Sequence, residues 1–229
     1  MERFRMIRPD RRTALRLFTL LMLTLAATSG YGCGLEKLVG GMAASYARTG
    51  THKVAYEYGG LQGKTFAVLV TAGKDIQYEY PWLTNQISEA ISLKLASEAG
   101  ASGFVPAATV NWYQSRNPQW EALSYSEISK ALGVERLIIV DIYEYRLHQP
   151  GNPYLWDGVV AGQVGVVEAD SSIPDEFIYE KDVQVAYPGK PGFGPSDMSR
   201  QDVITRLDIK FVRDVCWLFY DHEEPNYED

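Results

Sequence analysis

Residues 137–142, Leu-Ile-Ile-Val-Asp-Ile, decide the fold, because they form the centre of the strongest predicted strand, Val134 to Tyr145. Such a run of aliphatic and β-branched residues is typical of a strand buried on both faces of a sheet. Residues 65–70, Thr-Phe-Ala-Val-Leu-Val, form a second run of the same kind. The sequence therefore predicts two buried strands.

Two helices are predicted between these strands. In the first, apolar residues recur four apart from Leu83 to Leu95, and Gly100 supplies the stop. The second begins at a capping box, Ser124-Tyr-Ser-Glu127, and ends at Gly133. Between the helices, residues 103–113 are interpreted as containing a further strand, over Phe104-Val105 and then Ala108–Trp112.

The segment after residue 145 adds a hairpin and a final helix. Residues 156–169 and 176–187 are predicted strands, and the polar residues 170–175 connect them as an antiparallel hairpin. A helix is predicted from Ser199 to about Tyr220, because apolar residues follow one side of it. The acidic residues 222–229 are predicted to be a frayed tail.

These elements follow one another in the order β-α-β-α-β-β-β-α. Two strand–helix–strand units imply parallel neighbours, and the hairpin adds antiparallel strands to the same sheet. The predicted fold class is α/β, bordering on α+β, with a mixed sheet and helices packed on it. Residues 61–221 are predicted to form this single domain.

The first 32 residues are predicted to be a cleaved signal peptide. Six arginines fall within the first 16 residues, and the uncharged run Leu17–Ala27 and a stretch of small residues follow. The uncharged run has 11 residues, whereas a helix needs about 20 to span a bilayer. The sequence therefore predicts export.

Cys33 lies where bacterial lipoprotein signals place the cysteine that becomes lipidated. In Gly30-Tyr31-Gly32, the last glycine fits the usual lipobox, whereas the first stands where Leu is expected and the tyrosine is bulky. We expect residues 33–60 to be a lipidated N-terminus and tether, anchored in the lipid bilayer through acylated Cys33 and facing the periplasm. The alternative is a cut near Ser29, which would leave a soluble periplasmic or secreted protein.

Composition and charge exclude several classes of protein. The 229 residues are 46% apolar and 22% charged, as in globular proteins and unlike disordered or polytopic membrane proteins. Removal of residues 1–32 would change the formal net charge from −7 to −11. An acidic chain repels phosphate backbones, so nucleic acid is not expected as a partner.

The stretch Ala131–Val140, Ala-Leu-Gly-Val-Glu-Arg-Leu-Ile-Ile-Val, resembles a segment of the TolB amino-terminal and curli-secretion (CsgG-like) lipoprotein domains. The resemblance covers roughly residues 64–187 and includes the opening strand Phe66–Val70. It implies a periplasmic, non-catalytic domain used in envelope assembly, secretion or the activation of polymer synthases. The membrane hairpins of the pore-forming members are not expected, because charged residues crowd the one long hairpin here.

No catalytic, metal-binding or cofactor-binding residues are expected. None of the three histidines has a second His or Cys at ligand spacing. Cys216 lies among apolar residues and is interpreted as a buried hydrophobe, and Ser124 as a helix cap. Asp141 interrupts the strongest strand; it is either a buried, tuned carboxylate or, as we favour, a side chain that faces solvent.

Two aromatic-rich loops hold the candidate binding residues. Residues 111–120 and 147–156 both combine Trp, Tyr, Asn, Gln and Pro. These side chains could form a stacking surface for glycan or a hot spot for a protein, or they could pack over the sheet edges as satellite core. The candidates are Trp112, Tyr113, Trp120, Tyr154 and Trp156.

The leading hypothesis is a non-enzymatic envelope lipoprotein that binds another envelope protein or glycan as an assembly or accessory module. One alternative is a secreted hydrolase whose site assembles only in the fold. It would need a pocket that brings a carboxylate such as Asp141 to hydrogen-bond distance of a His or Ser. The other alternative is a glycan-binding module that uses the aromatic loops.

Overall fold

The computed structural model describes residues 50–226, which divide into two compact units. The larger unit comprises residues 53–223, and residues 50–52 and 224–226 belong to the smaller unit. The predicted signal peptide, Cys33 and most of the predicted tether lie outside the described residues, so the predicted boundaries of those segments stay predictions.

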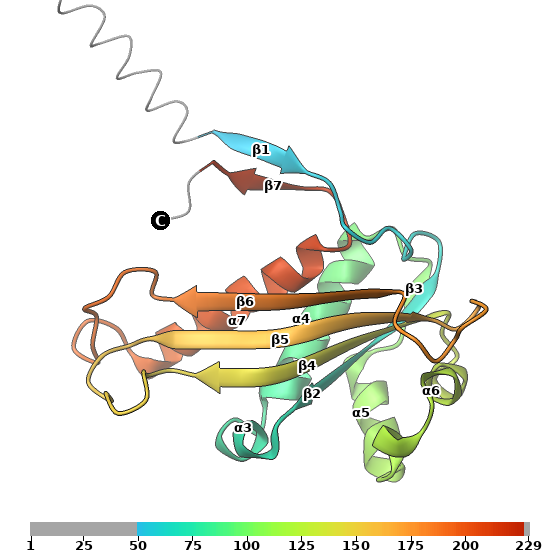
Figure 1. Ribbon diagram of the computed structural model, residues 1–229, viewed down its shortest axis with the longest axis horizontal. Coiled ribbons are helices and arrows are strands. Elements are labelled where there is room, and N and C mark those ends of the chain that lie inside the picture. Colours follow the sequence, from blue (N-terminus) through green and yellow to red (C-terminus); the bar gives the residue numbers. More distant parts are fainter. Residues whose placement is uncertain (1–49, 227–229) are drawn as a thin grey trace, which may run out of the picture. The chain divides into compact units, whose positions relative to one another are not determined.

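A five-stranded mixed sheet forms the centre of the larger unit (Figure 1), with the strand order β3-β2-β4-β5-β6. The strands are β2 (Thr65–Ala72), β3 (Gly103–Phe104), β4 (Arg136–Arg146), β5 (Gly158–Glu168) and β6 (Tyr179–Tyr187). β2 pairs in parallel with β3 and with β4, whereas β5 pairs antiparallel with β4 and with β6. The predicted fold class, with parallel neighbours and an added hairpin in one sheet, is confirmed.

Helices cover the two faces of this sheet unequally. Residues of α4 (Leu83–Glu98) and α7 (Arg200–Trp217) pack into the larger core cluster on one face. Residues of α5 (Ala107–Arg116) and α6 (Tyr125–Leu132) pack into a smaller cluster on the other face. Within residues 50–226, no helix combines the length and the apolar character needed to cross a membrane.

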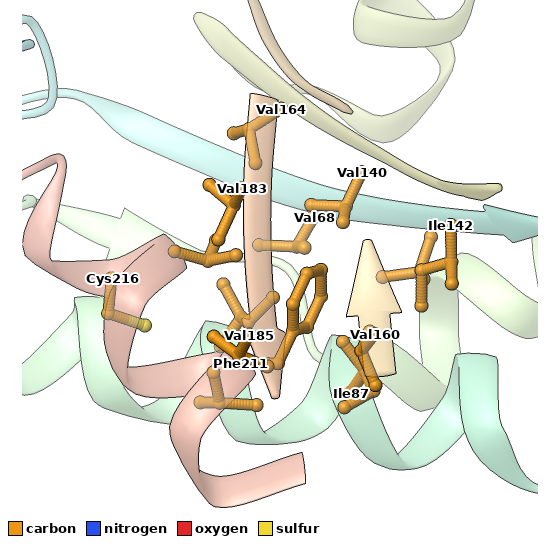
Figure 2. Packing of buried hydrophobic residues seen from close by; sticks show 14 of the residues in the cluster. Val68, Ile87, Val140, Ile142, Val160, Val164, Val183, Val185, Phe211 and Cys216 are labelled. Atoms are coloured by element: carbon orange, nitrogen blue, oxygen red, sulfur yellow. The ribbon is translucent and has the colours of Figure 1, made fainter. Parts of the chain in front are cut away.

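The larger cluster is a valine-rich core between the sheet and the helices α4 and α7. Figure 2 shows part of it, with Phe211 of α7 among valines of β5 and β6. Gly162 of β5 is required here, because a Cβ atom at this position would lie 3.2 Å from Cζ of Phe211 and 2.9 Å from the carbonyl oxygen of Asp141. The core thus fixes the position of the sheet, and the sheet positions the side chains on its other face.

Helix signals in the sequence are matched closely by the structure. The Ser124 hydroxyl accepts a hydrogen bond from the amide of Glu127, and the Glu127 carboxylate accepts one from the amide of Ser124, which completes the capping box of α6. Gly133 ends this helix with a φ of +69°, a conformation that glycine adopts without steric cost. A second capping box, from Ser199 and Asp202, begins α7.

The expected strand over residues 103–113 is wrong for most of its length. Only Gly103 and Phe104 form a strand, and α5 begins after Pro106. Proline is favoured at helix starts, and Val110 and Tyr113, three residues apart, pack into the smaller core cluster. Two of the predicted binding residues, Trp112 and Tyr113, therefore lie on α5 and not in a loop.

Three shorter segments also differ from expectation. Helix α3 (Lys74–Glu79) was not predicted, and a 3₁₀ turn, η1 (Trp120–Ala122), precedes α6. Residues 222–225 form a strand, β7 (His222–Pro225), that pairs with β1 (Thr51–Val54). The expectation that this part of the acidic tail is frayed is therefore wrong, because its strand partner is too distant in the sequence to be recognised from local pattern.

Candidate ligand-binding groove

The chain reverses its direction across the sheet between β2 and β4. From β2 it passes through α3 and α4 to β3, on one side of β2, and it returns through α5 and α6 to β4, on the other side. α4 and the pair α5–α6 lie on opposite faces. In open α/β sheets, ligands bind at the carboxyl ends of strands where the connections diverge in this way.

A groove of about 560 Å³ lies at this position, on the sheet face that carries α5 and α6. Its lining combines the end of β2, the middle of β4 and β5, and the η1–α6 segment. This volume falls within the roughly 300–1,000 Å³ that is typical of ligand sites.

Three polar side chains form a row across the floor of the groove. Strand register pairs Thr71 of β2 with Asp141 of β4, and Asp141 with Gln163 of β5. Oγ1 of Thr71 donates a hydrogen bond of 2.6 Å to Oδ1 of Asp141. The Asp141 side chain is exposed, as predicted, and among residues 50–226 no donor to its Oδ2 atom is found.

Aromatic side chains form much of the remaining lining. The ring of Phe177 lies over Gly165 of β5, where a Cβ atom would be only 2.5 Å from Cε1 of the ring. Tyr125 contacts Phe177, with 5.2 Å between the ring centroids, and Trp120 packs against the smaller core cluster. The glycine therefore makes room for the aromatic wall at the centre of the sheet.

A β-bulge places one further aromatic side chain in the groove. The register between β4 and β5 shifts between Ile142 and Glu144, and Tyr143 is left without a paired residue. The Tyr143 side chain is 55% exposed and lines the groove. Bulges commonly re-aim a side chain beside a functional site, and this one presents Tyr143 next to Asp141.

The groove has acidic and aromatic character. Asp141 and Glu121 contribute carboxylates, and the lining contains no Lys, Arg, His, Cys or Ser among the residues that the structure describes. The groove therefore brings neither a His nor a Ser side chain to Asp141, which is what the hydrolase alternative required. Exposed carboxylates, an amide and aromatic faces suit the binding of groups that donate hydrogen bonds or carry positive charge.

The first aromatic-rich segment is divided between surface and groove. Trp112 is 58% exposed, and the guanidinium of Arg116 lies 4.8 Å from the centre of its ring. Tyr113 is half-buried against the smaller core cluster. Trp120 is half-buried and lines the groove.

The second aromatic-rich segment does not contribute to the groove. Tyr154 is 79% exposed, whereas Trp156 is 5% exposed and belongs to the larger core cluster. Nε1 of Trp156 donates a hydrogen bond of 3.0 Å to the carbonyl oxygen of Met198, and the ring of His148 stacks on the indole. These contacts fit the packing alternative for Trp156 and not a binding role.

Two other residue assignments agree with the sequence. Cys216 is fully buried, and burial raises the pKa of its thiol to about 12, as expected of an inert core residue. Ser124 is a helix cap. Within residues 50–226, no group of three or more His, Cys, Asp or Glu side chains is arranged to hold a metal ion.

Sequence reasoning missed Thr71, Tyr143, Gln163 and Phe177 as parts of one site. A weak signal existed, since Thr71 and Asp141 are each the first polar residue after a buried apolar run. The register that places them side by side, however, is a property of the folded sheet. The position of Phe177 over Gly165 has no counterpart in local sequence pattern.

No protein-family model matches the chain, and no curated protein matches its sequence. Among solved structures, the chain is similar to the protein XCC0632 from Xanthomonas campestris, at 6% identity over 72% of this chain and 86% of that one, with a TM-score of 0.46. It is also similar to the PelC dodecamer from Paraburkholderia phytofirmans, at 10% identity over 75% of this chain and 97% of that one, with a TM-score of 0.43.

A third similar structure is the lipoprotein GNA1162 from Neisseria meningitidis, at 13% identity over 66% of this chain and 96% of that one, with a TM-score of 0.44. These values describe a distant likeness of the backbone, from which no function is transferred. The resemblance to the TolB amino-terminal and CsgG-like domains stays a prediction.

Proposed function

We propose that this chain is an exported, lipid-anchored accessory module of the cell envelope that binds another envelope component through the groove between β2 and β4. The basic and apolar leader of residues 1–32 supports export, and the position of Cys33 supports the anchor. The groove supplies the binding surface. The partner is another envelope protein.

One observation carries the binding role: the row Thr71–Asp141–Gln163 lies open at the point where the two connections diverge. Here the polar row is flanked by aromatic side chains in a concave site, which is the composition of ligand sites in general.

Site-specific photo-crosslinking tests this role in the full chain, expressed with its leader. The photoreactive residue p-benzoylphenylalanine replaces Tyr143, in the groove, or Tyr154, an exposed tyrosine outside it. We expect position 143 to yield a discrete crosslinked envelope protein after irradiation of intact cells, and position 154 to yield none.

A second experiment tests whether the crosslink depends on the groove. Asp141→Asn, introduced together with the photoreactive residue at position 143, should abolish the crosslink, whereas Glu89→Gln on α4 should leave it unchanged. Glu89 is exposed and lies on the opposite helix layer. Crosslinks of equal yield from both tyrosine positions, or none from position 143, would overturn the proposed binding surface.

The lipid anchor is tested separately. Intact-mass analysis of protein extracted from membranes should give the mass of a chain that begins at Cys33 and carries diacylglyceryl and N-acyl groups. An unmodified Cys33, or a chain that retains its first methionine, would contradict the proposed anchor and leave the groove proposal to its own test.

A further inference from the structure

The charge of the groove restricts which part of a partner can enter it. The carboxylates of Asp141 and Glu121 both line it, and neither forms an ion pair with a residue of the described range 50–226. Register pairs Gln163 with Asp182 of β6, so the polar row continues into a third carboxylate on the neighbouring strand. Anionic groups such as phosphate are therefore disfavoured.

One basic side chain of β4 beyond Asp141 is already paired with carboxylates. Arg146, farther along β4, binds Glu144 at 2.7 Å and Asp157 at 2.8 Å. Among residues 50–226 no cation is paired with Asp141, so its carboxylate is open to a cation from a partner.

The aromatic lining adds to the preference for a cation. Trp120 and Tyr143 line the same groove as Asp141, and the faces of indole and phenol rings attract ammonium and guanidinium groups. A carboxylate beside aromatic faces binds such a group more selectively than either does alone, because the carboxylate supplies charge and the rings exclude water.

We propose that the groove takes lysine or arginine side chains presented by an extended segment of the partner protein, with the cationic group held at Asp141 beside Trp120 and Tyr143. This inference rests on the proposed function and specifies the chemistry of its partner. The groove volume of about 560 Å³ accommodates more than one side chain, so the partner contributes a segment instead of a single residue.

Binding of short peptides to the full chain, purified in detergent, tests this chemistry. The probes are N-acetylated, amidated tetra-arginine and tetra-lysine, with tetra-citrulline as the uncharged analogue of tetra-arginine and chitotetraose as a neutral saccharide. Isothermal titration at 50 mM and 300 mM NaCl should show binding of the two basic peptides that weakens at the higher salt concentration. Tetra-citrulline should bind at least 10-fold more weakly than tetra-arginine.

Matched variants assign the binding to the groove. Asp141→Asn should weaken tetra-arginine binding at least 10-fold, whereas Glu89→Gln, which removes one exposed carboxylate from α4, should change it less than twofold. Equal losses in the two variants would show non-specific attraction to an acidic protein and would overturn the inference. Binding of chitotetraose in place of the basic peptides would also overturn it.

Failure of this inference is distinguishable from failure of the proposed function. If the crosslink at position 143 persists and depends on Asp141 while the basic peptides do not bind, the groove binds a partner of other chemistry. If the crosslink itself is absent, the binding surface is wrong.

Discussion

Thr71 and Asp141 face each other across the parallel strands β2 and β4, and the Thr71 hydroxyl donates a hydrogen bond of 2.6 Å to Oδ1 of Asp141. This bond holds one carboxylate oxygen and leaves the other directed to incoming groups. The two residues come from strands that are separated in the sequence by four α-helices, a 3₁₀ turn and a short strand. Their pairing therefore joins the end of β2 to the middle of β4 in one site.

Thr71→Val removes the hydroxyl while it keeps the shape of the side chain. Because the site is open to solvent, we expect the free energy of unfolding to change by less than about 1 kcal/mol. The loss of one hydrogen bond should weaken tetra-arginine binding by about 2- to 10-fold, measured by titration. Thr71→Ser keeps the hydroxyl and should bind like the wild type; equal affinity of the Val and Ser variants would show that the bond does not orient Asp141.

Trp156→Ala should destabilise the domain much more than Trp112→Ala. Trp156 is buried in the core and donates a hydrogen bond to Met198, so its truncation should cost about 3–5 kcal/mol. Trp112 is 58% exposed, and its loss should cost less than about 1 kcal/mol. Urea denaturation measures the free energy of unfolding of both variants. Similar losses would contradict the placement of Trp156 in the core and Trp112 on the surface.

Acid should weaken the fold through Asp170. Hydrogen bonds from Lys64 and then Arg136 lower the pKa of the Asp170 carboxyl to about 2, whereas an unfolded Asp titrates near about 3.9. The folded state therefore binds fewer protons than the unfolded state between these values, and the contribution of Asp170 to stability is present above about pH 4 and is lost as the pH falls toward 2.

Asp170→Asn removes this contribution. The variant should be less stable than the wild type at pH 7, and the difference should shrink as the pH is lowered from 4 to 2, as measured by chemical denaturation at each pH. A difference that stays constant over this range would show that the carboxylate is not held by Lys64 and Arg136.

The contribution of Asp208 to the free energy of unfolding should have the opposite pH dependence and decrease as the pH rises. It is 4% exposed on α7, and its oxygens accept hydrogen bonds from the hydroxyl of Tyr145 and the amide of Gln86. Burial raises the pKa of its carboxyl to about 6. The folded state therefore binds more protons than the unfolded state between about pH 4 and 6, so the contribution of this residue is largest below pH 4 and is lost as the pH rises to 6.

Asp208→Asn removes the titration and keeps a carbonyl oxygen for Tyr145. Relative to this variant, the wild type should lose on the order of 2 kcal/mol of unfolding free energy between pH 4 and pH 7. Denaturation curves at several pH values measure the difference. Parallel pH profiles for the two proteins would contradict the raised pKa of the buried Asp208 carboxyl.

The sequence predicted those parts of the fold whose signals are local. The apolar run around Leu137–Ile142 and the capping box at Ser124 each act over a few residues, and both are found as predicted. Helix α5 was missed because Thr109 and Val110 favour strands when considered alone, whereas the structure packs Val110 on the sheet at helical spacing. Tertiary packing therefore determines whether such a segment forms a helix or a strand.

The groove was largely beyond prediction for the same reason. Trp120 and Asp141 were each singled out, but as members of unrelated patterns, and Asp141 was favoured as a side chain that faces solvent. Their common membership of one groove depends on the register of β2, β4 and β5 and on a bulge at Tyr143. The candidate Trp156, in contrast, belongs to a segment whose composition is typical of a binding loop, but its side chain lies in the core.

The central claim is that the partner meets the domain at the groove between β2 and β4. The most direct measurement compares the crosslinks formed in intact cells by a photoreactive residue at position 143 with those formed at position 154. We predict one discrete envelope protein attached at position 143 and lost on Asp141→Asn. Attachment at position 154 alone, or at position 143 without regard to Asp141, would contradict the claim.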